Sequence, residues 1–413
     1  MSSSQNLKAK MMTKEAAVYD SFGHFFRFLI EEMKPRGPWL TPFNVISIPV
    51  IITGVIILYF RFVYGLGAVT NYSQEVPWGL WKGLNVVTGV ALAGGAYVIT
   101  FVVYVLGVKK YKSIVRVTVL NGFMAYSFYA GALLLDLGRP WFGFNPYIGN
   151  SFGFSSILFL ICWHFLLYMM AAFVEFSPAI AEWMHWEKAR KFLASLTLAT
   201  VILGIALSLL HQSGLGALYL MAKTKIHPLW WTEFIPILFF VSSVYAGLAM
   251  IIIEGTISHR VFKNLMGPDS HRSFDDIVLG LAKGAALTMF VYYFFKALLF
   301  IHDAQWELLN DGFGLWFLVE VIGFVLVPAL MFAFGFKHKN LRIIKIAAVM
   351  ALIGIVLNRL NISIICFNWY AEERYVPSWQ EFIVSMTVIF VQFWIFRWIV
   401  TRMPVLSSNH QQR

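Results

Sequence analysis

Ten long segments of mostly apolar residues alternate with short polar segments along this chain of 413 residues. Each is long enough to cross a hydrocarbon core of roughly 30 Å at a helical rise of 1.5 Å per residue. Hydrophobic residues make up 59% of the chain and charged residues only 13%, which excludes a soluble multidomain enzyme, a coiled coil and a disordered chain. The pattern predicts an all-α polytopic membrane protein whose ten transmembrane helices form helical bundles. The predicted spans are 44–66, 80–106, 114–135, 156–176, 191–215, 234–257, 276–301, 314–336, 343–366 and 381–401.

Positive charges predict the orientation of these spans. Lys and Arg number 21 in the segments on one side and 4 in those on the other. Because cytoplasmic loops carry the excess of basic residues, both termini are predicted to be cytoplasmic. The basic residues are divided among short loops and form no contiguous patch, so no nucleic-acid partner is expected.

Three regions follow from the orientation. Residues 1–43 form a cytoplasmic segment without the pattern of a cleaved secretory signal. Within it, 13–33 has the apolar spacing of an amphipathic helix in the membrane interface. Residues 44–401 form the ten-helix domain, and 402–413 form a cytoplasmic tail.

The cysteines and histidines limit the redox chemistry that this chain can carry alone. Cys162 and Cys366 lie in separate apolar spans, so no disulfide framework, zinc site or iron–sulfur motif can be built from them. A haem b would need histidines at matching depth on facing helices. His164 and His211 are the only candidates, and they differ in depth by about five residues, roughly 7 Å. We therefore predict no metal site, no haem and no iron–sulfur cluster in this chain.

Charged residues inside the spans are candidates for function because burying them in a membrane is costly. Long basic side chains can reach the interface instead, which we expect for Arg61, Lys82, Arg116, Lys296 and Arg397. The groups that this explanation does not cover are Asp136, His164, Glu175, His211, Glu254 and Glu320.

Two short motifs at predicted outer helix ends contain groups that exchange protons. DLGRP ends the third span with Asp136 and Arg139 three residues apart, and one interpretation is an ion pair that fixes the turn. HQSGLG places His211 beside Gln212, where the histidine can also simply cap its helix. On one face beside an apolar cavity, Asp136 and His211 would suit a quinone, whose carbonyls are hydrogen-bonded and protonated as electrons arrive.

These motifs also carry a family resemblance. DLGRP, the stretch from HQSGLG through LYLM to IHPLWW, and NRLN in the ninth span resemble the NrfD/PsrC family of quinone-interacting membrane subunits. The ten-span layout is most similar to its longer branch, which includes the HybB, ActC and QrcD subunits. The resemblance covers about 40–400 and implies a subunit of a respiratory redox complex in the bacterial inner membrane, without a redox centre of its own.

The resemblance also implies a site and partners. Menaquinone or ubiquinone would bind near the outer face, where the start of the second span and the acid of DLGRP line the pocket. Asp136 and His211 would be the catalytic pair. An iron–sulfur subunit on the periplasmic face would exchange electrons with the quinone, together with a multihaem cytochrome c or a molybdopterin-family subunit. The implied quinone-binding residues are Trp78, Trp81, Lys82, Asn85, Asp136, Arg139, His211 and Gln212.

Tryptophan is concentrated on the predicted outer side. Nine of the 15 tryptophans lie in or near the outer loops. A lopsided interfacial belt and a docking surface for a partner both explain this, and the sequence does not decide between them. The nine are Trp78, Trp81, Trp141, Trp230, Trp231, Trp306, Trp316, Trp369 and Trp379.

Ionisable residues in the inner half predict a water-filled half-channel from the cytoplasm to the quinone. The proposed path comprises His164, Glu175, Glu254 and Lys283. A plainer explanation is that Glu175 and Glu254, each about one turn from an inner helix end, are simply solvated.

A secondary transporter is the alternative function. Dividing the ten spans five and five gives halves of opposite topology, and GLWKG at 79–83 is echoed by GLAKG at 280–284. Such glycine spacing is nevertheless common wherever membrane helices pack closely.

Overall fold

The computed structural model describes residues 22–76, 78–148, 153–266 and 268–406 and confirms the all-α architecture. Ten of its helices are long and apolar enough to cross a membrane, and the described residues contain no β-strand beyond one bridge between Ile226 and Phe367. The spans run Pro42–Tyr64, Trp81–Val105, Lys109–Asp136, Ile157–Trp183, Glu187–Ala222, Ile235–Val261, Ser273–His302, Gly312–Lys337, Leu341–Ile365 and Trp379–Val400.

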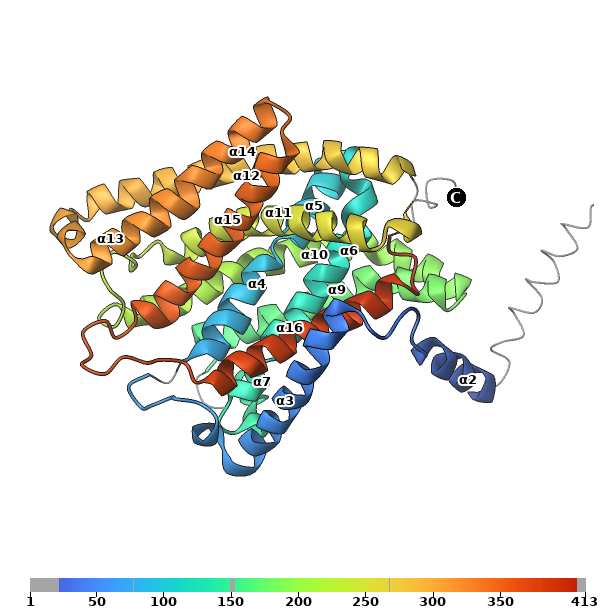
Figure 1. Cartoon of the computed structure of the whole chain (residues 1–413), viewed down its shortest axis with the longest axis horizontal. Coiled ribbons are helices and arrows are strands. Elements are labelled where there is room, and N and C mark those ends of the chain that lie inside the picture. The colour runs from blue at the N-terminus through green and yellow to red at the C-terminus, as the bar shows by residue number, and fades with distance from the viewer. Residues whose placement is uncertain (1–21, 77, 149–152, 267, 407–413) are drawn as a thin grey trace, which may run out of the picture. The chain divides into compact units, whose positions relative to one another are not determined.

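Spans two to five pack together as a first bundle (Figure 1). Spans two and three are interrupted by π-helical turns, which widen the helix locally and are frequent at functional sites. Span two consists of η3 (Trp81–Thr88), α4 (Gly89–Leu92), α5 (Gly95–Thr100) and η4 (Phe101–Val105). Span three consists of η5 (Lys109–Ile114), α6 (Val115–Ala125), η6 (Tyr126–Ala130) and α7 (Leu133–Asp136). Spans four and five are α9 (Ile157–Trp183) and α10 (Glu187–Ala217), the latter extended by η8 (Leu218–Ala222).

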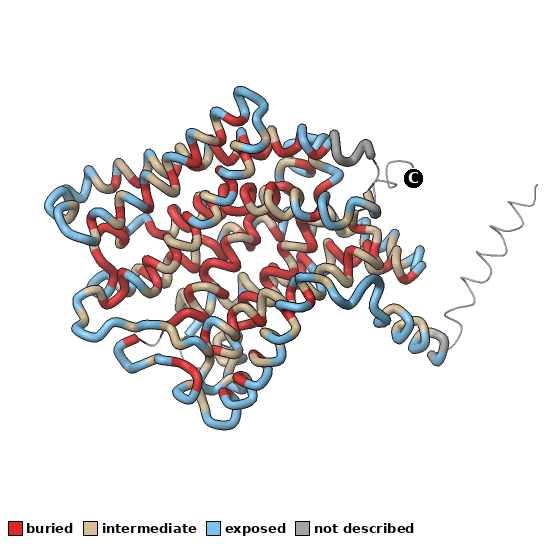
Figure 2. Tube along the Cα trace, viewed as in Figure 1, coloured by how far each residue is buried: buried red, intermediate tan, exposed pale blue. Residues whose placement is uncertain are grey.

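Spans six to nine form a second bundle, in which α12 packs against α11, α14 and α15, and α15 packs against α11 and α14. Many residues along its helices are buried in Figure 2, while other residues of the same helices are exposed or half-buried. The elements are α11 (Ile235–Val261), α12 (Pro268–His302), α13 (Gly312–Leu318), η11 (Val319–Leu326), α14 (Val327–Lys337), α15 (Leu341–Leu360) and η12 (Asn361–Ile365).

The two bundles meet where spans two and six cross with their backbones in contact. A Cβ atom at Gly247 would collide with the backbone of Gly94 and Gly95, and one at Gly94 would collide with the carbonyl group of Ser243. Small residues permit such close approach, which gains van der Waals contact between membrane helices. This crossing fixes span two, which carries the predicted site residues Trp81, Lys82 and Asn85, against the second bundle.

Helices α3 (Pro42–Tyr64) and α16 (Trp379–Val400) also approach each other closely. A Cβ atom at Gly54 would collide with the side chain of Thr387, whose hydroxyl donates to the carbonyl of Val50 at 3.2 Å. Helix α16 also packs against η3 and η6, so it closes one side of the first bundle. Most of the apolar surface of α3 stays exposed, as expected for a helix that faces lipid.

Hydrogen bonds join the loops 65–80, 223–234, 303–311 and 366–378, and we call the end of the bundles that carries these loops the outer end, after the predicted topology. Asn71 donates to the carbonyl of Val376 at 3.0 Å, and Gln305 donates to that of Pro228 at 3.1 Å. The backbone N–H of His227 donates to the carbonyl of Cys366 at 2.9 Å. The loops therefore form one connected layer above the spans.

The chain divides into two compact units, Met1–Pro49 and Val50–Arg413. In the first, α2 (Phe22–Met33) follows the predicted amphipathic pattern, because Phe26, Ile30 and Met33 expose apolar side chains along one stripe. The earlier part of the predicted helix, 13–21, and the tail residues 407–413 lie outside the described residues. On the inner side, α9 and α10 extend into the predicted loop 177–190 and leave only a short turn between them.

Candidate functional site

An ion pair joins spans two and three at the outer end. Lys82, in the first turn of η3, places its Nζ 2.9 Å from Oδ2 of Asp136, the last residue of α7. The side chain of Asp136 is 1% exposed and that of Lys82 is 23% exposed. Lys82 therefore does not extend to solvent as a free snorkelling side chain. It supplies the cation that a buried carboxylate requires, and its Nζ also lies 5.8 Å from the ring centroid of Trp78.

Arg61, and not Arg139, stabilises the turn that follows Asp136. Arg61 is 2% exposed and donates to the carbonyl of Leu135 at 2.7 Å and to that of Leu137. The side chain of Arg139 is exposed, and no ion pair joins it to Asp136 in the described part of the chain. The predicted ion pair across the turn is therefore wrong. The snorkelling explanation also fails for Arg61, because its guanidinium satisfies carbonyls at a broken helix end.

A hydrogen-bonded group beside this ion pair was not predicted from the sequence. The hydroxyl of Tyr375 donates to Oε2 of Glu381 and accepts from the backbone N–H of Leu80 at 3.0 Å. The ring of Tyr72 lies 6.0 Å from that of Tyr375 and is close to Asp136. Burial raises the pKa of Tyr72, and the carboxylate of Asp136 raises it further, so this phenol stays protonated.

Glu381 is completely buried and anchors the start of α16. Its Oε1 accepts from the backbone N–H groups of Ser378 and Asn71, each at 3.1 Å, and Ser378 caps the helix in return. Trp81 donates from Nε1 to the carbonyl of Glu381 at 3.0 Å. The indole of Trp81 therefore connects span two to α16, and Trp78 forms the aromatic wall beside Lys82.

Three predicted polar residues deeper in the first bundle are buried and incompletely hydrogen-bonded. Both side-chain polar atoms of Asn85, Oε1 of Gln212 and Nε2 of His211 lack a hydrogen-bond partner among the described residues. Nε2 of Gln212 donates to the carbonyl of Val90 at 2.8 Å, which ties span five to span two. Because unsatisfied buried polar atoms are costly, such a set indicates bound water or a polar ligand.

Asp136 and His211 are not in direct contact. The His211 ring packs 5.3 Å from that of Tyr126 and 6.2 Å from that of Phe165, and its Nδ1 lies 3.3 Å from the carbonyl oxygen of Ile161. Tyr126 precedes Asp136 by ten residues on span three, about 15 Å along a helix. The two predicted catalytic residues therefore lie at different depths, with Asn85 and Gln212 on the spans beside them.

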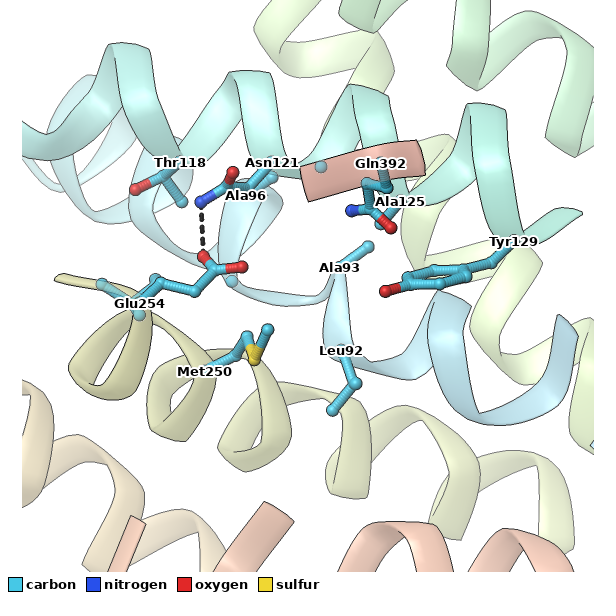
Figure 3. A pocket seen from close by; sticks show the side chains of 13 residues that line it. Leu92, Ala93, Ala96, Thr118, Asn121, Ala125, Tyr129, Met250, Glu254 and Gln392 are labelled. Carbon is cyan, nitrogen blue, oxygen red and sulfur yellow. Dashed lines mark hydrogen bonds between the residues drawn. The ribbon is translucent and has the colours of Figure 1, made fainter. Parts of the chain in front are cut away.

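Two small cavities meet at Glu254 in the inner half of the protein. One, of about 20 Å³, extends from Glu254 and Asn121 to Tyr129 and Gln392 (Figure 3). The other, of about 30 Å³, extends from the same pair towards the inner end at Ser258. Each exceeds the volume that one water needs, and Asn121 donates a hydrogen bond to the Glu254 carboxylate between them. Glu254 is therefore half-buried between two cavities and is not a simply solvated side chain.

The remaining residues of the predicted proton path, which are Glu175, His164 and Lys283, do not lie together. Glu175 lines a separate cavity of about 10 Å³ with Tyr168, and its Oε1 has no hydrogen-bond partner among the described residues. His164 lies near His211, with its Nδ1 likewise unpartnered there. Lys283 is exposed on α12 with its Nζ 5.8 Å from the Phe336 ring centroid, and it lines none of these cavities.

Spans six to nine contain a second polar cluster, of which the sequence analysis singled out only some members. Glu320 accepts from Trp230 at 2.6 Å, from Asn358 at 2.7 Å and from Asn361. Arg359, 1% exposed, donates to Asn358 at 2.7 Å and stacks on the ring of Phe239 at 3.6 Å. Lys296 is also buried, against the ring of Phe317, so the snorkelling explanation fails for it too.

The two GLxKG segments have different surroundings. Gly79 packs against Tyr72 and Tyr375, and the lysine that follows it forms the ion pair with Asp136. Gly280 packs against Tyr111, and its lysine is exposed. The sequence echo therefore does not extend to the contacts of these two segments.

Most of the nine outer tryptophans take part in packing. Trp316 donates to Asn361 at 2.9 Å and Trp231 donates to the carbonyl of Tyr219 at 3.2 Å. Only three of the nine belong to the large exposed apolar side chains, namely Trp141, Trp306 and Trp379. The surplus of tryptophan thus serves mainly to build the outer end of the bundles.

Comparisons with known proteins agree with the motifs. A family model described as polysulphide reductase, NrfD, matches residues 68–403. A protein of Nitratidesulfovibrio vulgaris is 39% identical over 372 residues, which cover 90% of this chain and 96% of that protein. The probable Ni/Fe-hydrogenase 2 b-type cytochrome subunit of Escherichia coli is 27% identical over 375 residues, 89% of this chain and 95% of that subunit. The integral membrane subunit of a menaquinone reductase, also from N. vulgaris, is 27% identical over 371 residues, 79% of this chain and 82% of that subunit.

The matched region, 68–403, contains the Lys82–Asp136 ion pair and the hydrogen-bonded Tyr375 and Glu381. It also contains the buried polar residues of the first bundle and the cavities at Glu254. It also contains the DLGRP and HQSGLG motifs from which the resemblance was inferred. The chain therefore belongs to the polysulphide reductase NrfD family of integral membrane proteins.

Proposed function

We propose that this protein is the quinone-binding membrane subunit of a respiratory redox complex in the bacterial inner membrane. It passes electrons between an iron–sulfur subunit at its outer end and menaquinone or ubiquinone. The observation that carries the proposal is the ion pair of Lys82 with the buried Asp136, together with the unsatisfied amide of Asn85 three residues after Lys82. Relatives named as subunits of a menaquinone reductase and of a hydrogenase support a redox function of this class.

Each residue of the outer end has a part in this proposal. Asp136 exchanges protons with the quinone oxygen, while Lys82 holds the Asp136 side chain in place and Trp78 covers the face of the headgroup. Asn85 offers both a donor and an acceptor. Arg139 is exposed at the rim of the same end, where it can interact with a polar headgroup or a docked subunit.

The deeper residues have supporting parts. Gln212 holds span five against span two, and Trp81 holds span two against α16. His211 is the second proton-exchanging group, and it acts below the headgroup and not beside Asp136. Reduction of one quinone takes two electrons and two protons, and in this proposal His211 relays one of these protons from below the headgroup.

The redox centres belong to the partner in this proposal. Among the described residues, no three His, Cys, Asp or Glu side chains form a group that could hold a metal ion. The iron–sulfur subunit would dock on the outer loop layer, joined in the complex by a multihaem cytochrome c or a molybdopterin-family subunit. Both termini would then be cytoplasmic and the docking face periplasmic, with lipid around the apolar helix faces.

Protons would reach the quinone from the inner side. The cavities that meet at Glu254 lead from Ser258 to Tyr129, which precedes Asp136 by about two helical turns. Glu175 and His164 belong to a parallel branch within the first bundle. Lys283 lies outside both routes, so we do not assign it a part. Electrons from outside and protons from inside would make the reaction electrogenic.

The quinone site is tested by turnover of the purified complex. We expect Asp136→Asn and His211→Ala each to lower quinone turnover at least tenfold while the complex still assembles. Asp276→Asn, which changes an exposed acid at the inner end of α12 and away from the proposed docking surface, is the control. Wild-type turnover in both site variants would contradict the proposal.

The proton route needs a separate measurement. In proteoliposomes, Glu254→Gln and His164→Ala should slow the build-up of membrane potential together with quinone turnover. The exposed inner-end variant Asp275→Asn should leave both unchanged. A full potential at wild-type rates in Glu254→Gln and His164→Ala would rule out an inner proton supply.

A further inference from the structure

A cavity of about 390 Å³ lies at the outer end of the protein, lined by the end of span nine and the start of α16. Leu360 and Ile364 of span nine and Phe382 of α16 give it apolar walls. Phe382 is 48% exposed, and Val376, which also lines the cavity, is 68% exposed, so the cavity is open at the protein surface. Its volume falls within the range of sites that take organic ligands.

The cavity is charged at its outer end and apolar below. Glu373 and Arg374 line it from the loop 366–378, and both residues are exposed. Ile364 lies beneath this loop at the end of span nine, and Leu360 lies about one helical turn deeper. A phospholipid of the outer leaflet has the same order of parts, with its charged headgroup outside and its acyl chains towards the middle of the membrane.

Both charged residues keep the capacity to bind a headgroup. Arg374 donates to the carbonyl of Trp369 at 3.1 Å, and its guanidinium lies 5.1 Å from the ring centroid of Phe313. An arginine has five N–H donors, so most of them remain for a ligand. Neither Glu373 nor Arg374 forms an ion pair within the described part of the chain.

The two opposite charges favour a headgroup that also carries two. An anionic phospholipid would place its phosphate beside Glu373 as well as Arg374, and a quinone would leave Glu373 without a partner. The phosphate and primary ammonium of phosphatidylethanolamine match both residues with charge-assisted hydrogen bonds. The other basic residue of this region, Lys225, has its Nζ 5.9 Å from the ring centroid of Phe367 and does not line the cavity.

We propose that this cavity is a specific site for one phosphatidylethanolamine molecule of the outer leaflet. One acyl chain lies against Leu360 and Ile364. The phosphate accepts hydrogen bonds from Arg374, and the ammonium group donates to Glu373. Phosphatidylcholine carries the same charges, but its quaternary ammonium has no N–H to donate, so it binds more weakly.

The bound lipid stabilises the loop 366–378, which also carries Tyr375. The hydroxyl of Tyr375 donates to Glu381 and accepts from the backbone N–H of Leu80, so this loop is joined to the starts of α16 and of span two. The lipid thus supports the outer end of the bundles from its lipid-facing side. The inference does not depend on the proposed quinone function.

Photocrosslinking of the full chain in nanodiscs tests the site. Three probes with a diazirine in the acyl chain, of phosphatidylethanolamine, phosphatidylglycerol and phosphatidylcholine, are compared in nanodiscs that contain equal amounts of the three lipids. Labels on 360–365 and 376–382 report the cavity, and labels on 52–63 of α3, which exposes apolar side chains, report bulk lipid. The ratio of cavity labels to α3 labels should be about threefold higher for phosphatidylethanolamine than for either other probe. Equal ratios for the three probes would overturn the proposal.

Two exposed substitutions test the headgroup contacts with little risk to folding. Arg374→Gln and Glu373→Gln should each lower the phosphatidylethanolamine ratio about threefold. Glu372→Gln is the matched control, because Glu372 is an exposed acid next in sequence that does not line the cavity. A wild-type ratio in Arg374→Gln or in Glu373→Gln would contradict the contact assigned to that residue.

A third variant and a competitor test the cavity itself. Ile365 lines the cavity and is 37% exposed, so Ile365→Trp narrows the cavity with room for the added ring, and the ratio should fall for all three probes. An unchanged ratio would show that the labels do not come from the cavity. If excess menaquinone lowers the cavity labels but not the α3 labels, a quinone occupies the cavity and the inference is wrong. If the lipid preference holds while Asp136→Asn and His211→Ala keep wild-type turnover, only the proposed quinone site is refuted.

Discussion

Lys82 and Asp136 form an ion pair, with their charged atoms 2.9 Å apart, between the first turn of one membrane span and the last turn of the next. Taking two charges out of water is expensive, and their attraction repays the cost only when both partners remain. The pair therefore fixes the relative height of spans two and three. It also presents a carboxylate of defined charge in an otherwise apolar surrounding.

Lys82→Met should destabilise the protein strongly. It leaves the Asp136 carboxylate buried without its cation, which typically costs about 3–5 kcal/mol. Thermal unfolding in nanodiscs would show this as a large fall in Tm. The double variant Lys82→Met/Asp136→Leu should recover most of the Tm without recovering quinone turnover, because an apolar pair can replace a buried ion pair structurally. A single variant as stable as the wild type would contradict the contribution of this ion pair to stability.

The crossing of spans two and six should tolerate no added side chain. Gly247→Ala places a methyl group against the backbone of Gly94 and Gly95, so the helices must separate, and we expect a loss of about 1–3 kcal/mol. Gly323→Ala is the control, because a Cβ there meets open space. Thermal unfolding of both variants in the same detergent checks this, and equal Tm values would refute the close crossing.

His227 should make the outer loop layer sensitive to acid. It is completely buried, and its ring centroid lies 4.7 Å from that of Phe313 and 4.8 Å from that of Trp369. Burial lowers the pKa of His227 from its usual 6.5, with Asp311 acting in the opposite sense. Below pH 6.5 the unfolded chain therefore binds more protons than the folded one at this position, and the free energy of unfolding falls as the pH decreases towards the folded pKa.

The measurement is the Tm of the wild type and of His227→Gln over a pH range from about 5 to 8. The variant should be less stable at neutral pH but should lose less stability on acidification. The exposed histidine variant His302→Gln, at the same end, is the control. The same acid dependence in His227→Gln and the wild type would show that His227 does not contribute to it.

Hydrophobic runs and positive charges were enough to predict the ten spans, because the length of an apolar segment and its flanking charges are local properties of a sequence. Asp136 could be singled out for the same reason, as an acid at the end of an apolar run. Its partner could not, since Arg139 is near in sequence and Lys82 is near only in space. Lys82 is the partner of Asp136 because spans two and three pass close to each other.

The π-helical turns explain a second limit of the sequence. Lys82, Asn85, Tyr126, Glu320 and Asn361 all lie in such turns, and their directions depart from the regular helical period. Periodicity therefore could not show which face each side chain takes. Glu381 was missed for another reason: an acid at the start of a helix normally marks a solvated cap, whereas this one is buried beneath the loop that contains Tyr375.

Labelling with a photoreactive azidoquinone tests the central claim most directly. The oxidised probe is added to the purified complex, illuminated, and located by mass spectrometry of the peptides. We expect labels within 78–88 and 126–140, the segments that carry Lys82, Asn85 and Asp136, and their loss in Asp136→Asn. Labels confined to spans six to eight would contradict a quinone site at the ion pair. So would labelling that is no greater than the labelling measured in the presence of an excess of unlabelled quinone.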